Sequence, residues 1–97
     1  MSDIEEKEHH PQFIALKVKS FAILKDIIGT QQITLRLPRK QEVTTVADLR
    51  IRILELYPEI SAQRIAMGIA VNAKMANDKS VINDFDEIAL LPPISGG

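Results

Sequence analysis

Residues 45–58 read TVADLRIRILELYP and contain the strongest helix signal of the chain. The opening Thr45-x-x-Asp48 has the form of a capping box, in which the hydroxyl accepts from an orphan backbone N–H and the carboxylate lies at the positive helix end. Pro58 ends the segment. We therefore predict a helix long enough to cross a sheet, with one face formed by apolar residues at helical spacing: Val46, Leu49, Ile53 and Leu56.

The segments on both sides of this helix alternate between apolar and polar residues, as half-buried strands do. The predicted order is strand, short helix, strand, long helix, strand, strand: residues 13–19, 21–28, 33–37, 45–57, 67–71 and 87–91. This order favours an α+β fold of the β-grasp type, with one mixed sheet and one main helix packed across it. The pattern alone leaves ferredoxin-like arrangements open.

Length and composition limit the organisation of the chain. Its 97 residues fit one domain, and an apolar share of 45% with only 4% aromatics predicts an aliphatic core. We divide it into a flexible acidic N-terminal tail (1–12), a folded domain (13–91) and an extended C-terminal tail (92–97). No signal peptide and no apolar run of about 20 residues is present, so we expect a cytoplasmic protein that does not cross a membrane.

Several classes of chemistry are disfavoured by the residues themselves. The absence of cysteine excludes disulfides, cysteine zinc sites and a thiol nucleophile. Twelve basic against 13 acidic residues give no basic excess for nucleic acid. His9 and His10 are adjacent without a third ligand nearby, so we predict no metal site. Without a side-chain catalytic cluster, an enzyme acting alone is a poor hypothesis.

The chain ends in EIALLPPISGG, residues 87–97. Pro92 cannot donate to a sheet ladder, so strand pairing should stop there. Consecutive prolines favour a stiff extended backbone, and residues 92–97 can reach roughly 20 Å beyond the sheet. Gly96 and Gly97 give the narrowest tip that a peptide can have. A frayed terminus is the alternative, but the uninterrupted run of strand, double proline and Gly-Gly favours an arm that enters a partner's active site.

This ending and several internal segments resemble one known family, the small, sulfur-carrying subunit of molybdopterin synthase. The resemblance covers residues 13–97 and is most specific in the tail. The segments that match are Phe21-Ala22, Ile27-Ile28-Gly29, Ala70-Val71-Asn72, Asp86-Glu87-Ile88 and Ile88 to Gly97. Two departures stand out. Phe85 occupies a turn position where the family often has glycine, and Leu90-Leu91 stands where bulky aromatics are frequent.

The resemblance implies a ubiquitin-like β-grasp fold and a mechanism. An activating enzyme uses ATP to adenylate Gly97, and a sulfur donor converts it to a thiocarboxylate. The tail then enters the large catalytic subunit, where the sulfur is transferred to a pterin precursor to build the dithiolene of the molybdenum cofactor. The chain itself is then a non-catalytic subunit of a heterotetramer and binds no cofactor or metal.

Each site residue has an expected role under this resemblance. Gly97 carries the sulfur and Gly96 keeps the tip thin, while Leu91 and Phe85 contact the partner. The remaining tail residues form the inserted segment: Pro92, Pro93, Ile94 and Ser95.

Three alternatives remain open from the sequence. The first is a related carrier for thiamine synthesis or tRNA thiolation, with the same activation chemistry and a different acceptor. The second is a ubiquitin-like protein modifier, in which Gly97 forms an isopeptide bond to lysine. The third is an interaction domain with an inert tail.

Overall fold

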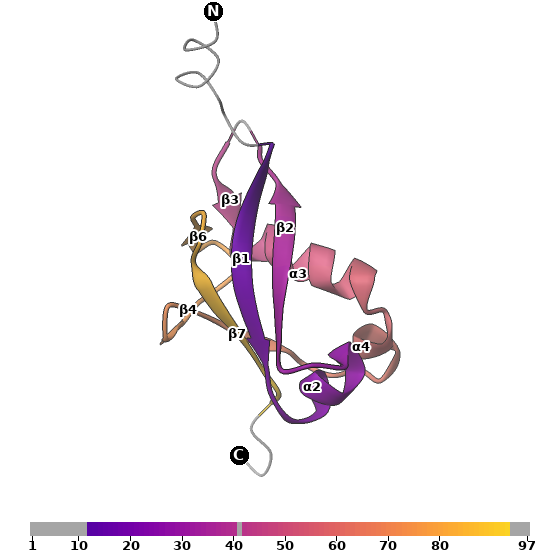
Figure 1. The fold of residues 1–97 in the computed structure, drawn as a ribbon. Helices are drawn as coiled ribbons and strands as arrows, with labels where there is room; N and C mark the ends of the chain where they lie inside the picture. The colour runs from indigo at the N-terminus through magenta and orange to yellow at the C-terminus, as the bar shows by residue number, and fades with distance from the viewer. Residues whose placement is uncertain (1–11, 41, 94–97) are drawn as a thin grey trace, which may run out of the picture.

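A mixed sheet and one long helix organise the fold (Figure 1). The computed structural model describes residues 12–40 and 42–93. Along the chain the elements are β1 (Phe13–Ser20), α2 (Ala22–Ile28), β2 (Gln32–Pro38), β3 (Thr44–Thr45), α3 (Val46–Leu56), α4 (Glu59–Ala62), β4 (Gly68–Val71), β5 (Lys74–Met75), β6 (Val81–Ile82) and β7 (Glu87–Leu91).

The first and last strands pair in parallel at the centre of the main sheet. The strand order is β2-β1-β7-β4-β5, and every pairing other than β1 with β7 is antiparallel. Helix α3 crosses this sheet, and a second, two-stranded sheet of β3 and β6 lies beside it. The predicted mixed sheet with one main helix, the β-grasp arrangement, is confirmed.

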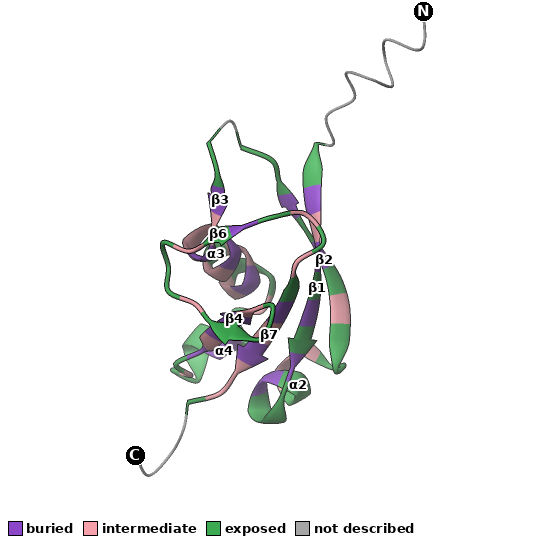
Figure 2. Cartoon of the chain, turned by 90° about the vertical axis from the view of Figure 1, so that its left-hand side faces the viewer, coloured by how far each residue is buried: buried purple, intermediate pink, exposed green. Residues whose placement is uncertain are grey.

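The core lies between the sheet and α3. Strand β1 alternates as predicted, with Ile14, Leu16 and Val18 buried, and the buried side of α3 faces it (Figure 2). On α3, Val46, Leu49 and Ile53 are almost fully buried. The prediction for Leu56 is wrong, because this side chain is 41% exposed. The chain turns directly after it into α4, which places the fully buried Ile60 in the same core.

The shortest elements are absent from the predicted order. Strands β3, β5 and β6 have two residues each, too few to show a period, and α4 has four. A turn forms at Asn72 and Ala73, which both have positive φ, and leads from β4 into β5. Val81 and Ile82, which lie between the predicted elements, pair with β3.

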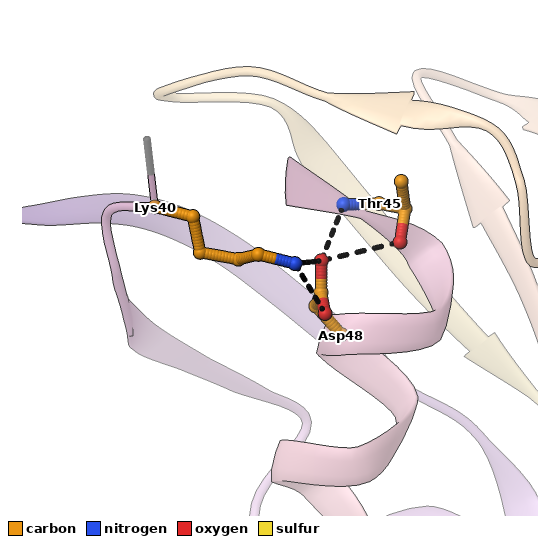
Figure 3. Close-up of polar contacts among 3 residues, drawn as sticks. All are labelled: Lys40, Thr45 and Asp48. Carbon is orange, nitrogen blue, oxygen red and sulfur yellow. Dashed lines mark hydrogen bonds and ion pairs between the residues drawn. The ribbon is translucent and has the colours of Figure 1, made fainter. Parts of the chain in front are cut away.

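A glycine ends α2, and the predicted capping box begins α3. Gly29 ends α2 with a φ of 94°, and its N–H donates to the Lys25 carbonyl at 2.8 Å. At the start of α3 the capping box forms, and the Thr45 N–H donates to Asp48 Oδ2 at 2.9 Å (Figure 3). Lys40 Nζ donates to both carboxylate oxygens of Asp48 at 3.2 Å. The pKa of Asp48 is lowered, chiefly by the Thr45 N–H; burial acts in the opposite direction, and the Lys40 ammonium adds to the lowering.

Candidate functional site

The C-terminal tail begins at a strand that is paired on both sides. Strand β7 is hydrogen-bonded to β1 on one side and to β4 on the other. Ile88 and Leu90 point into the core and are 1% and 0% exposed. The predicted bounds of this strand, residues 87–91, agree with the structure. The start of the tail is therefore fixed by two ladders and by core packing at once.

The start of β7 is fixed by a polar network around one asparagine. Asn72, at the end of β4, accepts from the Glu87 N–H at 2.9 Å, and its side-chain amide donates to Asp86 at 3.0 Å. The Asn72 N–H also donates to the Glu87 carbonyl at 2.7 Å. Asp86 in turn accepts from the Asn83 N–H at 2.8 Å. These bonds hold β7 in register and so determine where the tail leaves the sheet.

Pro92 and Pro93 follow directly after the last paired residue, as predicted. Regular strand structure ends at Leu91, Pro92 is half-buried, and Pro93 is exposed. A proline has no N–H to donate, so the ladder cannot continue through this pair. The other predicted tail residues lie outside the described residues, and their roles stay predictions: Ile94, Ser95, Gly96 and Gly97.

An apolar surface lies next to the exit of the tail, and we call its residues Gly68, Met75 and Leu91 the exit platform. Leu91 pairs with Gly68, and a Cβ atom on Gly68 would lie 3.5 Å from Met75 Cε and 3.9 Å from Leu91 Cβ. Met75 is 67% exposed. Sequence reasoning missed Met75, because β5 is too short to show on which face of the sheet its side chains lie.

Phe85, the second predicted contact residue, lies at the opposite end of β7. Its N–H donates to the Ala15 carbonyl at 2.7 Å, and the Ala15 N–H donates to Asp84 Oδ1 at 2.7 Å. The φ of Phe85 is +68° and its side chain is 74% exposed. The structure therefore does not bring Phe85 and Leu91 together, and a partner that touches both would have to cover the length of β7.

The described residues contain no cluster suited to metal binding. Within residues 12–40 and 42–93, His, Cys, Asp and Glu side chains do not gather in groups of three or more. The prediction for His9 and His10 falls outside this part of the chain. In the same ranges, none of the helices has the length and apolar character needed to cross a bilayer.

The strand order with its parallel central pair is that of the ubiquitin-like β-grasp fold, and here its central strand leads into Pro92 and Pro93. The chain belongs to the ThiS family, whose defining pattern matches residues 18–97. It is 36% identical over 83 residues to the molybdopterin synthase sulfur carrier subunit of Dictyostelium discoideum, which covers 84% of this chain and 94% of that protein. The resemblance seen in the sequence is confirmed.

Solved structures agree on the fold. The small archaeal modifier protein 1 of Methanosarcina acetivorans matches with a TM-score of 0.70 and 24% identity, over 90% of this chain and all of that one. A chain from the complex of subunits 1 and 2 of the molybdopterin-converting factor of Helicobacter pylori matches with a TM-score of 0.57 and 24% identity, over 87% of this chain and all of that one.

Proposed function

We propose that this chain is the sulfur carrier of a molybdopterin synthase, with the sulfur held at the carboxyl group of Gly97. The observation that best supports the proposal is the course of β7, a doubly paired central strand that leads straight into Pro92 and Pro93. The similarity to a named sulfur carrier subunit over 94% of its length supports the same role.

Activation is needed because a free carboxylate is a poor electrophile. In the proposed first step, a Gly97 carboxylate oxygen attacks the α-phosphate of ATP in an activating enzyme, forming an acyl adenylate and releasing pyrophosphate. A sulfide equivalent from a sulfur donor then attacks the Gly97 carbonyl carbon, and AMP leaves with the original oxygen. The result is a thiocarboxylate, and no electrons are gained or lost overall when the sulfur arrives as sulfide.

The thiocarboxylate sulfur is then transferred to a pterin precursor inside the large catalytic subunit. The sulfur forms a bond to a carbon of the precursor as an oxygen substituent leaves that carbon and takes up a proton. Water then hydrolyses the resulting thioester at the Gly97 carbonyl, which restores the carboxylate and leaves the sulfur on the precursor as a thiol. Two successive carriers supply the two sulfurs of the dithiolene. The chain's own contribution is to present a narrow arm on a fixed base, and the exit platform gives the large subunit an apolar contact beside that arm.

A mass measurement tests the proposal most directly. After incubation with ATP, the activating enzyme and a sulfur source, the intact protein should gain the mass of one oxygen-to-sulfur exchange, and fragmentation should localise it to Gly97. A variant without Gly97 serves as the matched control and should gain nothing. Sulfur at another position, or none with an enzyme that is active on its own carrier, would overturn the proposal.

The acceptor separates this function from its alternatives. The thiocarboxylate form mixed with the large subunit and the pterin precursor should yield the dithiolene product. A carrier for thiamine synthesis or tRNA thiolation would not yield this product. A protein modifier would instead appear in cell extracts as conjugates linked from Gly97 to lysine.

A further inference from the structure

Strand β2 forms an edge of the main sheet with an open row of backbone groups. It pairs with β1 alone in the part of the chain that the structure describes. The Arg39 N–H donates to the Gln12 carbonyl at 2.8 Å, and the Gln31 carbonyl accepts from the Ser20 N–H at 2.9 Å. The backbone N–H and C=O groups of the odd-numbered residues of β2 therefore point toward β1. The N–H and C=O groups of Thr34 and Arg36 therefore point to the open side.

An apolar groove runs beside this open edge, between β2 and α3. Its volume is about 370 Å³. Two of its lining residues are the buried Leu37 and, on α3, Ile51, whose side chain is 57% exposed. Charged side chains are also part of the lining, but they are paired with one another, Lys40 with Asp48 and Arg52 with Glu55. The groove therefore offers apolar contact without an unpaired carboxylate that would repel an acidic ligand.

The opposite face of the same edge is basic. Arg36, Lys17 and Lys19 alternate with the buried residues of β2 and β1 and lie on the open face of the sheet. Among the described residues, Arg36 has no acidic partner. A strand added to β2 would place alternate side chains on the two faces of the sheet, one set over the groove and the other beside Arg36.

We propose that the β2 edge and its groove are a docking site for an extended peptide whose residues alternate between aliphatic and acidic. The peptide adds as a sixth strand, hydrogen-bonded to the backbone of Thr34 and Arg36. Its aliphatic side chains fill the groove against Leu37 and Ile51, and its carboxylates lie beside Arg36. Because open edges of this kind promote unwanted pairing unless they are covered, a specific strand partner also accounts for the exposed edge.

This docking site is independent of the sulfur-carrying tail. The groove lies at the Leu37 and Pro38 end of β2, where β1 begins, whereas the tail leaves from the opposite end of the parallel β7 (Figure 1). A peptide bound at the groove therefore leaves the tail and the exit platform free. A protein that carries such a strand can hold the chain while the tail is in an active site.

A titration of the full chain with a synthetic peptide tests the proposal. We expect a capped peptide of alternating glutamate and valine to bind, with NMR shifts centred on Thr34, Arg36 and the α3 residues of the groove. The same peptide with lysine for glutamate should bind at least about tenfold more weakly, because its charges face Arg36. Equal binding of the two peptides, or shifts centred on the exit platform, would overturn the proposal.

Two variants test the contacts separately. Thr34→Pro removes an edge N–H and keeps the ladder to β1, and Thr34→Ala is its control because the N–H remains. Thr34→Pro and Ile51→Glu should each weaken peptide binding by about tenfold or more, while Thr34→Ala should not. Circular dichroism verifies that each variant is folded. If Thr34→Pro unfolds, the binding result for Ile51→Glu decides the question instead. Unchanged binding in a folded variant contradicts the proposal, as does a dimer of the free chain that Thr34→Pro abolishes, since β2 would then pair with itself.

Discussion

Phe85 holds a backbone conformation that favours glycine. Its φ of +68° is in the left-handed region, where a β-carbon costs about 1–2 kcal/mol. The phenyl ring is 74% exposed, so little core packing offsets this cost within the chain. The cost and the exposure together support the expectation that the ring makes a contact with a partner.

Replacement of Phe85 separates the backbone from the ring. Phe85→Gly should raise the free energy of unfolding by about 0.5–1 kcal/mol, since relief of the left-handed strain exceeds the entropy cost of glycine. Phe85→Ala is the control that removes the ring and keeps the strain. If the ring contacts the large subunit, both variants should weaken that complex equally in calorimetric titrations, although only Phe85→Gly is stabilised. Full affinity in both variants would show that Phe85 does not contact the large subunit.

At the scale of elements, the sequence predicted those that are long enough to show a period. The alternation of Ile14, Leu16 and Val18 identified β1, and the capping box at Thr45 identified the start of α3. The pairing of β3 with β6 joins residues far apart in the chain, and β3, β5 and β6 have only two residues each, too few to show a period, so the sequence could not predict them. For the same reason Met75 was missed at the candidate site, whereas the end of β7 at Leu91 was predicted from Pro92 alone.

The start of α3 should make stability depend on pH. The lowered pKa of Asp48 means that folding favours its charged form, so its contribution is present above the ordinary pKa of a carboxyl and is lost as pH falls through the lowered value. Asp48→Asn should cost about 0.5–1 kcal/mol at neutral pH, and the difference from wild type should shrink below about pH 4. Urea denaturation between pH 7 and pH 3 measures this.

Lys40→Gln is the matched variant for the capping box. It removes the ion pair to Asp48 and keeps the Thr45 N–H bond, which is the larger cause of the lowered pKa. Because the Lys40 side chain is 44% exposed, we expect a loss below about 0.5 kcal/mol. A Lys40→Gln loss as large as that of Asp48→Asn, or an Asp48→Asn difference that is constant with pH, would contradict this account of the helix start.

At the scale of the whole molecule, shortening the tail should affect the proposed sulfur transfer and leave the stability of the fold almost unchanged. Regular pairing ends at Leu91, so removal of Gly96 and Gly97 should change the free energy of unfolding by no more than about 0.5 kcal/mol. Sulfur transfer should be abolished, because the terminal carbonyl moves back by roughly 7 Å. Thermal melts and a dithiolene assay measure both effects, with the unmodified chain as the reference.

Either half of this expectation can fail by itself. A truncated chain that still supports dithiolene formation would show that the terminus is not the sulfur carrier. A truncated chain that unfolds would show that the tail is part of the folded domain.

The parallel pairing of β1 with β7 also determines how the molecule responds to mechanical force. The two strands run in the same direction, with β1 beginning at one end of the molecule and β7 ending at the other. A pull on the tail therefore acts along the strands, and the bonds between β7 and its neighbours are sheared together rather than opened one after another. If a partner pulls on the chain beyond Leu91, the load is therefore shared along the whole ladder, and we expect β7 to stay paired under a force that would open a hairpin pair by pair.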